Sequence, residues 1–327
     1  MILVLSANAG LDRTYLVSNF TVGMYHHPRR FRVLPGGKGV NVARVLRQLG
    51  DEVIVTGFCG GHTGAALTSM LKADGVRTEF VRIAEDSRTC LNIVDETTKV
   101  QTQLDEVGPL VSPSELGQLS HQWGRLLQHA QMVVIAGSAP RGVPFDAYVD
   151  LIFTAKERKL PVILDVREPY LSPAVQAGPT VLKPNLNELN ALAGSELSVP
   201  AGVAQAGRDL LRYGIKMVLA SLGKQGAIAV TGEAGSWWAK PPQTDAVSDV
   251  GSGDAMVAGL VHASLSRVSL QARLRWAVAA GTVNAAQFGA GLCDRAEVEK
   301  LVEGVQVQPL TPEGEPQPAA APAPAEP

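Results

Sequence analysis

The stretch VNVARVLRQLGDEVIVTGFC, residues 40–59, contains a helix pattern that is followed at once by a strand pattern. Up to Gly50, apolar residues recur every three or four positions, as on the buried face of an amphipathic helix. The second half is a short apolar run, which is typical of a strand covered on both faces. A helix joined to a fully buried strand predicts one unit of a parallel α/β sheet.

The same alternation continues on both sides of this stretch. One helix has a readable start, with Ser112 as N-cap, Pro113 in the first turn and Glu115 placed for a capping box. Further apolar runs end at polar or glycine-rich turns, at residues 2–7, 132–137, 161–166, 180–185 and 217–223. We therefore predict an α/β fold, doubly wound, with a mostly parallel sheet flanked by helices.

Three segments depart from this rhythm. Residues 12–34 and 87–104 show strands with polar alternation and hairpin turns but no helix between them, which predicts a small separate sheet acting as a lid. Residues 309–327 read PLTPEGEPQPAAAPAPAEP, a composition that cannot bury a core, so we expect a disordered tail. The folded domain is accordingly placed at residues 1–308.

Composition excludes several classes of protein. The chain has 327 residues, and 29 Lys and Arg against 31 Asp and Glu leave a net charge of −2, with no overall field to attract nucleic acid or an anionic membrane. Its three cysteines form no CxxC pair, so neither a disulfide framework nor a zinc site is indicated. No run approaches the roughly 20 apolar residues of a membrane span. We expect a cytoplasmic protein without nucleic-acid or membrane partners.

The motif Gly251-Ser252-Gly253-Asp254 precedes a small-residue helix pattern. Glycines let consecutive N–H groups turn to one side, and a helix N-terminus adds about half a positive charge, so the motif can stabilise a phosphoryl group. Asp254 beside it can accept a proton from an attacking hydroxyl. The alternative is a simple glycine turn in which Asp254 caps the helix.

A second glycine cluster, PGGKGVN at residues 35–41, leads directly into the helix of the opening stretch. Backbone at Gly36 and Gly37 can approach a small polyol, Lys38 can face an anion, and Asn41 can bond hydroxyl groups. A helix start with a solvent-exposed lysine is the alternative.

Two further turns are compatible with a nucleotide. In LKPNLNEL, Asn185 and Glu188 lie three residues apart past a strand end, so they can hold the water shell of Mg²⁺, with Lys183 near the phosphates; the alternative is a helix cap. The turn from Ser221 to Gly226 can line a ribose and phosphates, or it simply joins two strands.

Taken together, NAGLD, GGKGVN, KPNLNE and DVGSGDAMVAG in this order resemble the ribokinase-like carbohydrate kinases, the PfkB family, over about residues 1–305. The resemblance implies a doubly wound domain with a small β lid and a sugar cleft between them. It implies that Asp254 is the base and that Gly251, Ser252 and Gly253 form the anion hole for the γ-phosphate.

The resemblance also assigns residues to ATP and Mg²⁺. Asn185 and Glu188 match the pair that organises the metal, and Asn284 is expected near adenine. The remaining nucleotide contacts that it implies are Lys183, Ser221, Gly223, Lys224 and Gly226. Asp165 and Arg167, after the strand VILD, receive no role, because this branch of the family usually has other residues there.

On the acceptor side, the resemblance is to the branch that phosphorylates ketohexose phosphates. It implies a hydroxyl-binding set of Asp12, Gly36, Gly37, Lys38 and Asn41. The phosphate of the acceptor needs a local cationic cluster, for which the candidates are Lys38, Arg88 and Arg141, with Arg29, Arg30 and Arg32 as weaker ones. Ser138 is a further predicted substrate-binding residue.

The expected reaction is ATP-dependent conversion of fructose 1-phosphate into fructose 1,6-bisphosphate. Tagatose 6-phosphate and fructose 6-phosphate are the alternatives within the family. A non-catalytic nucleotide or sugar sensor is the alternative outside it, and the presence of Asp254 argues against a sensor. An NAD-dependent oxidoreductase is disfavoured, because no GxGxxG follows the first strand. A homodimer formed through the lid edges is a further expectation.

Overall fold

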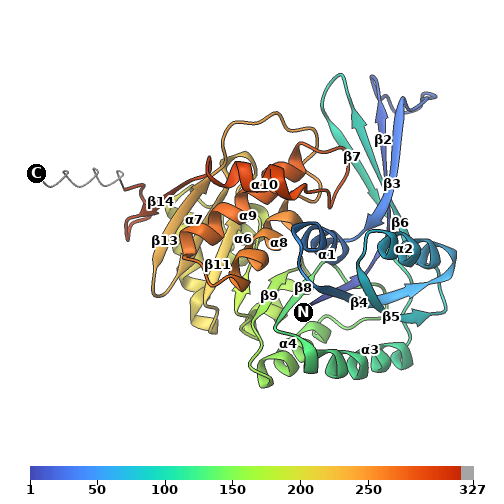
Figure 1. Cartoon of the computed structure of the whole chain (residues 1–327), viewed down its shortest axis with the longest axis horizontal. Helices are drawn as coiled ribbons and strands as arrows, with labels where there is room; N and C mark the ends of the chain where they lie inside the picture. Colours follow the sequence, from blue (N-terminus) through green and yellow to red (C-terminus); the bar gives the residue numbers. More distant parts are fainter. Residues whose placement is uncertain (318–327) are drawn as a thin grey trace, which may run out of the picture.

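The structure is a computed structural model that describes residues 1–317, and it has two β-sheets and two layers of helices (Figure 1). Within these residues the larger sheet has ten strands. In chain order they are β1 (Ile2–Asn8), β4 (Val53–Gly60), β5 (Arg77–Ile83), β8 (Met132–Ala136), β9 (Val162–Asp165), β10 (Val181–Leu182), β11 (Met217–Ser221), β12 (Ala227–Thr231), β13 (Gly235–Lys240) and β14 (Gln306–Leu310).

The order of the large sheet is β14-β13-β12-β11-β10-β9-β8-β1-β4-β5. All neighbours from β11 to β5 are parallel, whereas β12, β13 and β14 are added as an antiparallel edge. The predicted doubly wound, mostly parallel sheet is therefore confirmed.

Alternating side chains of the strands enter two separate cores. In β1, Ile2 and Val4 face one core, and Leu3 and Leu5 face the other. The first core is covered by α1 (Lys38–Leu49), α2 (Gly61–Ala73), α8 (Ser252–Leu265), α9 (Leu270–Ala285) and α10 (Arg295–Val302). The second is covered by α3 (Pro113–Leu126), α4 (Ala147–Glu157), α5 (Leu171–Gln176), α6 (Leu186–Ala193) and α7 (Ala201–Leu210). Burial on both faces explains why these strands lack polar alternation.

The start of α3 follows the predicted capping box. The Glu115 backbone N–H donates to Ser112 Oγ, and the Ser112 N–H donates to Glu115 Oε2 at 2.7 Å. Two otherwise unpaired amides of the first turn are thereby satisfied.

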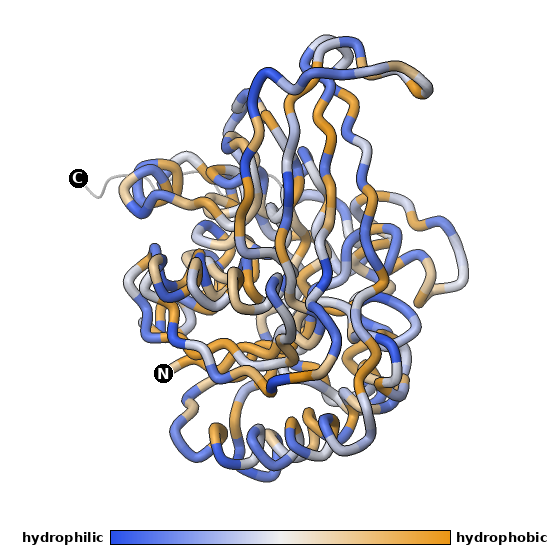
Figure 2. The backbone as a smooth tube through the Cα atoms, turned by 90° about the vertical axis from the view of Figure 1, so that its right-hand side faces the viewer, coloured by the Kyte–Doolittle hydropathy of each residue, from blue (hydrophilic) through white to orange (hydrophobic). Residues whose placement is uncertain are grey.

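The smaller sheet contains β2 (Gly10–Val17), β3 (Arg30–Gly36), β6 (Arg88–Asp95) and β7 (Gln101–Asp105) in the order β3-β2-β6-β7. Its strands stand side by side above the body of the protein (Figure 2). They come from the two segments that broke the βα rhythm, so the predicted second sheet is confirmed. Polar alternation in these strands fits a sheet with a solvated face.

The expected boundary of the tail at residue 308 is wrong. Pro309 and Leu310 belong to β14, where they pair with Trp237 and Ser236 of β13, and Leu310 is buried. Burial of Leu310 and hydrogen bonding to the edge of β13 order this segment. The Pro-rich composition of residues 309–327 as a whole does not reveal these two contacts. The rest of the predicted tail from residue 318 onward lies outside the described residues.

Among residues 1–317, no helix combines the length and apolar character required to cross a bilayer.

Candidate active site

The predicted site residues gather where the parallel strands of the large sheet end. Asp165 is the last residue of β9, Lys183 follows β10, Ser221 ends β11, and α8 begins beside them with the glycine motif. The carboxyl edge of a parallel sheet is where ligands bind in open α/β folds.

Asp254 lies in the first turn of α8 and is 5% exposed. Asn41 of α1 donates a hydrogen bond from Nδ2 to Asp254 Oδ2 at 2.9 Å. Burial, together with the nearby Asp165 carboxylate, raises the pKa of Asp254 to about 6, although Lys38, the Asn41 bond and Lys183 act in the opposite direction. The carboxylate is thus largely ionised at neutral pH and basic enough to accept a proton in a reaction.

Next to Asp254 lies a buried ion cluster centred on Asp165. Its Oδ1 is 2.7 Å from Lys38 Nζ, and its Oδ2 is 3.3 Å from Lys183 Nζ. Burial alone would raise the pKa of Asp165, but the two lysines outweigh it and hold that pKa below its usual value. Burial alone would lower the pKa of Lys38, but the negative charges of Asp165, Asp254 and Glu188 outweigh it and raise that pKa. Two cations are therefore held beside Asp254.

Sequence reasoning gave Asp165 no catalytic role and did not foresee its place between the two lysines. The available signal was positional, because a carboxylate directly after a buried parallel strand lies at the binding edge of the sheet.

The glycine motif forms the turn that starts α8. Gly251 has φ +80°, and a Cβ added there would lie 2.6 Å from Ala290 Cβ, so only glycine fits. A Cβ on Gly253 would lie 3.4 Å from Lys183 Nζ, which places a buried lysine against the first turn of the helix. Free helical amides and a lysine thus converge, and this combination suits a phosphoryl group.

Asn284 supports this turn from inside the protein. Its Nδ2 donates to Val250 O at 2.9 Å, and its Oδ1 accepts from Leu292 N at 3.3 Å. The residue is 0% exposed. The predicted contact with adenine is therefore wrong for this conformation, because the amide group is already used to hold the loop before α8.

Asn185 and Glu188 form a capping box at the start of α6. Glu188 N donates to Asn185 Oδ1 at 2.8 Å, and Asn185 N donates to Glu188 Oε2 at 2.9 Å. The other oxygen, Glu188 Oε1, is 3.9 Å from Lys38 Nζ, at the edge of the ion cluster. The helix-cap alternative is realised, and the same carboxylate still faces the site.

The donor set can be tested against the needs of Mg²⁺. Within residues 1–317 there is no group of three His, Cys, Asp or Glu side chains arranged around a metal position. Mg²⁺ commonly keeps several waters and is bound through one or two carboxylates plus substrate phosphates. Glu188 at the edge of the ion cluster fits that requirement, and a fully protein-bound metal does not.

The turn between β11 and β12 adjoins α6, since Ser221 and Asn185 form an isolated parallel β-bridge. Gly223 has φ +57° and open space around it, and Lys224 follows it on the surface. Gly226 turns the chain back at φ +84°, where a Cβ would overlap Ala239 O. Ser221, at the start of this turn, is thus brought next to Asn185. Sequence reasoning missed Trp238, whose Nε1 donates to Gln225 O at 2.9 Å and braces the turn.

The predicted hydroxyl-binding residues lie where the small sheet meets α1. Gly36 leaves room for the Asp12 carboxylate, which a Cβ at Gly36 would overlap. Gly37, with φ +103°, is the N-cap of α1 and precedes Lys38. Burial raises the pKa of Asp12 to about 6, whereas Arg88 and a hydrogen bond from Gly37 counteract this rise. Gly36 and Gly37 lie two residues and one residue before Lys38 of the ion cluster, so these hydroxyl-binding groups stand close to that cluster.

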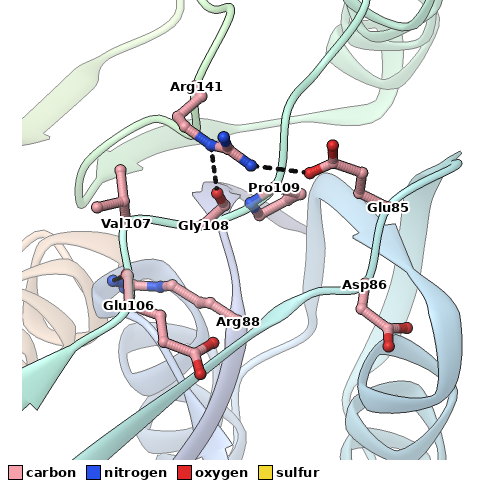
Figure 3. A pocket seen from close by; sticks show the side chains of 8 residues that line it. All are labelled: Glu85, Asp86, Arg88, Glu106, Val107, Gly108, Pro109 and Arg141. Atoms are coloured by element: carbon pink, nitrogen blue, oxygen red, sulfur yellow. Dashed lines mark hydrogen bonds and ion pairs between the residues drawn. The ribbon is translucent and has the colours of Figure 1, made fainter.

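A cavity of about 510 Å³ opens beside this region (Figure 3). Arg88 Nε donates to Asn8 O at 2.9 Å, and Asn8 Nδ2 donates to Ser138 Oγ at 3.3 Å. Arg141 pairs with Glu85 at 3.0 Å across the cavity and donates to Gly108 O. The cavity is lined by Glu85, Asp86, Arg88, Glu106, Val107, Gly108, Pro109 and Arg141. The two predicted arginines share it, together with three carboxylates that sequence reasoning did not include.

The weaker candidates on the small sheet are used elsewhere. Arg29 pairs with Glu96 at 2.9 Å, and Arg32 donates to Phe288 O at 3.3 Å. The Arg30 guanidinium lies 4.8 Å from the centre of the Phe288 ring. These three side chains do not join the cavity with Arg88 and Arg141.

Comparison with known proteins agrees with this geometry. The sequence model of the pfkB family carbohydrate kinases matches residues 6–297. The 1-phosphofructokinase of Rhodobacter capsulatus is 35% identical over 312 residues, covering 95% of this chain and 98% of that protein. Phosphofructokinase-2 of Escherichia coli in complex with substrates and products superposes with a TM-score of 0.86 at 30% identity, covering 93% of this chain and 98% of that chain.

Two further solved structures extend this result. The tetrameric inhibited form of the same Escherichia coli enzyme gives a TM-score of 0.85 at 30% identity, with coverages of 93% and 98%. Ribokinase of Arabidopsis thaliana, complexed with ribose and ATP, shares the fold with a TM-score of 0.73 at 21% identity, covering 92% of this chain and 98% of that one. With a family match over most of its length and a buried carboxylate at the glycine turn, the chain belongs to the PfkB family of carbohydrate kinases, which use ATP to phosphorylate sugars.

Proposed function

We propose that this kinase transfers the γ-phosphoryl group of ATP to the free primary hydroxyl of fructose 1-phosphate, and so forms fructose 1,6-bisphosphate and ADP. The observation that carries the proposal is the buried Asp254, bonded to Asn41 and set at the first turn of α8. Its proton affinity and its position match those required of a base for an alcohol. Fructose 1-phosphate is favoured by the resemblance to the 1-phosphofructokinase of Rhodobacter capsulatus.

In the proposed reaction Asp254 accepts the proton of the attacking hydroxyl as the new P–O bond forms and the bond to ADP breaks. Asn41 holds the carboxylate in place, and its own Oδ1, buried and without a partner within residues 1–317, can accept from a substrate hydroxyl. The amides of the Gly251–Gly253 turn and the Lys183 ammonium face the charge that develops on the phosphoryl oxygens.

ATP would lie along the turn from Ser221 to Gly226, with its phosphates directed at Lys183 and the start of α8. Asn185 and Glu188 would hold the hydrated Mg²⁺ ion, which neutralises charge on the phosphates when bound. Because both side chains also cap α6, the metal site would be fixed by the same bonds that start the helix.

The phosphate already present on the acceptor would occupy the cavity of Figure 3, where Arg88 and Arg141 supply the positive charge. Glu85 now pairs with Arg141, so a phosphate with about two negative charges would replace this carboxylate as the partner of the guanidinium. A sugar without phosphate offers no such replacement. The cavity thus supports a phosphorylated acceptor over a free sugar.

The decisive assay follows ADP release by purified protein with Mg-ATP and one acceptor at a time. We expect the highest kcat/KM with fructose 1-phosphate, lower values with fructose 6-phosphate and tagatose 6-phosphate, and the lowest with free fructose. Preference for either 6-phosphate would assign that reaction instead, and equal rates with free fructose would reject the phosphate site.

The role of Asp254 is tested in the same assay. Asp254→Asn should lower kcat by about 10²–10⁴-fold, the usual contribution of a positioned base. Asp209→Asn makes the same chemical change on the exposed surface of α7 and should keep the wild-type rate. A wild-type rate in Asp254→Asn would show that the base lies elsewhere, and nucleotide binding without turnover in the wild type would indicate a sensor.

A homodimer through the small sheet and a cytoplasmic location are also proposed. Strand β3 is an edge of that sheet, and Phe31 on it and Tyr25 in the preceding loop are 66% and 99% exposed, an arrangement suited to contact with a second copy. The three cysteines are buried free thiols, as expected in a reducing compartment. Light scattering on Tyr25→Ser against wild type tests the dimer, because a monomer in the wild type would reject it.

A further inference from the structure

A buried arginine on α1 holds the loop segment that packs against the start of α8. Arg44 lies on α1, three residues after Asn41, and is 3% exposed. Its Nη1 donates to Ala290 O at 3.0 Å, and its Nε donates to Asp74 Oδ2 at 2.7 Å. Buried guanidinium groups are costly unless they are fully paired, so this one has a specific structural purpose.

The carbonyl that Arg44 holds belongs to the segment that packs on the glycine motif. A Cβ on Gly251 would lie 2.6 Å from Ala290 Cβ, 3.1 Å from Ala290 Cα and 3.3 Å from Gly291 N. A Cβ on Gly291 would in turn lie 2.9 Å from Arg44 Nη1 and 3.1 Å from Asn41 Oδ1. The 288–293 segment is therefore packed tightly between α1 and the turn that starts α8.

Gln48 strengthens the same connection one turn further along α1. Its Nε2 donates to Gly291 O, and its Oε1 accepts from Cys293 N, both at 2.8 Å. Asn41, Arg44 and Gln48 are spaced three and four residues apart, so they lie on one face of the helix. That face binds Asp254 at one end and two loop carbonyls at the other.

We propose that Arg44 is a positioning residue for phosphoryl transfer. By holding Ala290 against Gly251, it fixes the anion-binding turn relative to Lys38 and Asn41 on its own helix. The inference rests on the proposed transfer at Asp254. Arg44 would not touch ATP or sugar, so its loss should lower kcat while the KM for ATP changes little, because a displacement of about 1 Å at a reacting centre can cost about 10²-fold.

The test compares Arg44→Met with Asp74→Asn. Arg44→Met removes the bond to Ala290, whereas Asp74→Asn removes only the charge of the half-exposed partner at the other side of the guanidinium. We expect kcat to fall at least tenfold in Arg44→Met with the KM for ATP within about twofold, in the range set by such displacements. Asp74→Asn should stay within about twofold of wild type in both values.

Hydrogen exchange gives a readout that does not depend on the identity of the sugar. Amides of residues 250–254 and 288–293 should exchange faster in Arg44→Met than in wild type. In Asp74→Asn their exchange rates should equal those of wild type. Arg44→Lys, which keeps the charge but cannot reach both partners, should recover only part of the rate.

Wild-type kcat and exchange in Arg44→Met, or an equal loss in Asp74→Asn, would overturn the inference. If Arg44→Met does not fold, Gln48→Met decides, because it removes the bonds to Gly291 and Cys293 from the same segment while Arg44 stays paired. A lower kcat with faster exchange at 288–293 supports the inference, and wild-type behaviour rejects it. If the wild type is inactive with every sugar phosphate, the proposed function fails, while the exchange comparison still decides the role of Arg44.

Discussion

At the scale of single residues, two buried carboxylates divide the work of the site. Asp165 is shared by two lysines, which hold its pKa below the usual value against the effect of burial, so it remains an anion. Among the described residues, the Asp254 side chain has only the neutral amide of Asn41 as a hydrogen-bond partner, and burial together with the Asp165 charge raises its pKa to about 6. The same type of side chain thus has a lowered pKa in one surrounding and a raised pKa in the other, and the raised one suits the proton acceptor that we propose.

The raised pKa of Asp254 predicts a specific dependence of stability on pH. Because the folded pKa of about 6 exceeds the model-peptide value of 3.8, its contribution to stability is complete below pH 3.8 and is lost as pH rises through 6. Asp254→Asn lacks this loss and should be more stable than wild type by up to about 3 kcal/mol above pH 7. Urea unfolding of both proteins at several pH values measures the difference, and a gap that widens toward acid would contradict the shift.

A second residue-scale prediction concerns Asp165. Asp165→Asn leaves Lys183, which is 3% exposed, without its anion, and breaking such a pair costs about 3–5 kcal/mol. Urea unfolding at pH 7 measures the loss. Glu52→Gln, which removes an exposed pair with Arg77, should cost at most about 1 kcal/mol and serves as the control. Similar losses in both variants would show that the cluster is not held by charge.

At the scale of elements, the site is built from helix starts at the carboxyl edge of the sheet. α1 contributes Lys38 and Asn41, α6 contributes Glu188, and α8 contributes Asp254 in its first turn. Their N-terminal amides face the region where phosphates are expected, and the dipoles add to the charge of the lysines. The turn before α8 leaves no room for a side chain, because a Cβ on Gly251 would lie 2.6 Å from Ala290 Cβ.

Gly251→Ala should therefore reduce kcat by about tenfold or more, since forcing φ +80° on alanine costs about 1–2 kcal/mol and the new Cβ also meets Ala290. Gly194→Ala is the matched control, because Gly194 has φ +70° with open space around it. It should lose similar stability in thermal unfolding and keep its kcat. Equal kcat values in the two variants would show that the turn tolerates displacement.

At the scale of the whole molecule, the small sheet contacts both loops that flank the start of α8. Arg32 donates to Phe288 O, and Ser248 Oγ donates to Gln101 Oε1 of β7 at 3.1 Å. A sheet attached at these points can cover the cleft and limit the access of water to the phosphoryl group. Movement of the small sheet would first displace the loops beside the turn that starts α8.

The architecture was predictable because buried parallel strands and amphipathic helices leave patterns in local sequence. Asp254 was also predictable, as it lies within a contiguous motif. Asp165 was not, because its importance depends on two lysines 127 and 18 residues away that only the folded chain brings together. The buried state of Asn284 and the pairing of β14 likewise depend on contacts distant in sequence.

The ordering of Gln306–Leu310 matters for any shortened form of this protein. Removal of the residues after 305 would leave the backbone N–H and C=O groups of Gly235–Lys240 unpaired at the edge of the large sheet. Such an edge recruits other chains by strand addition. We expect that shortened protein to precipitate or polymerise on standing, which turbidity would reveal, while protein ending at residue 317 stays clear. Residues 306–310, whose sequence looks dispensable, would thus prevent self-assembly of the protein.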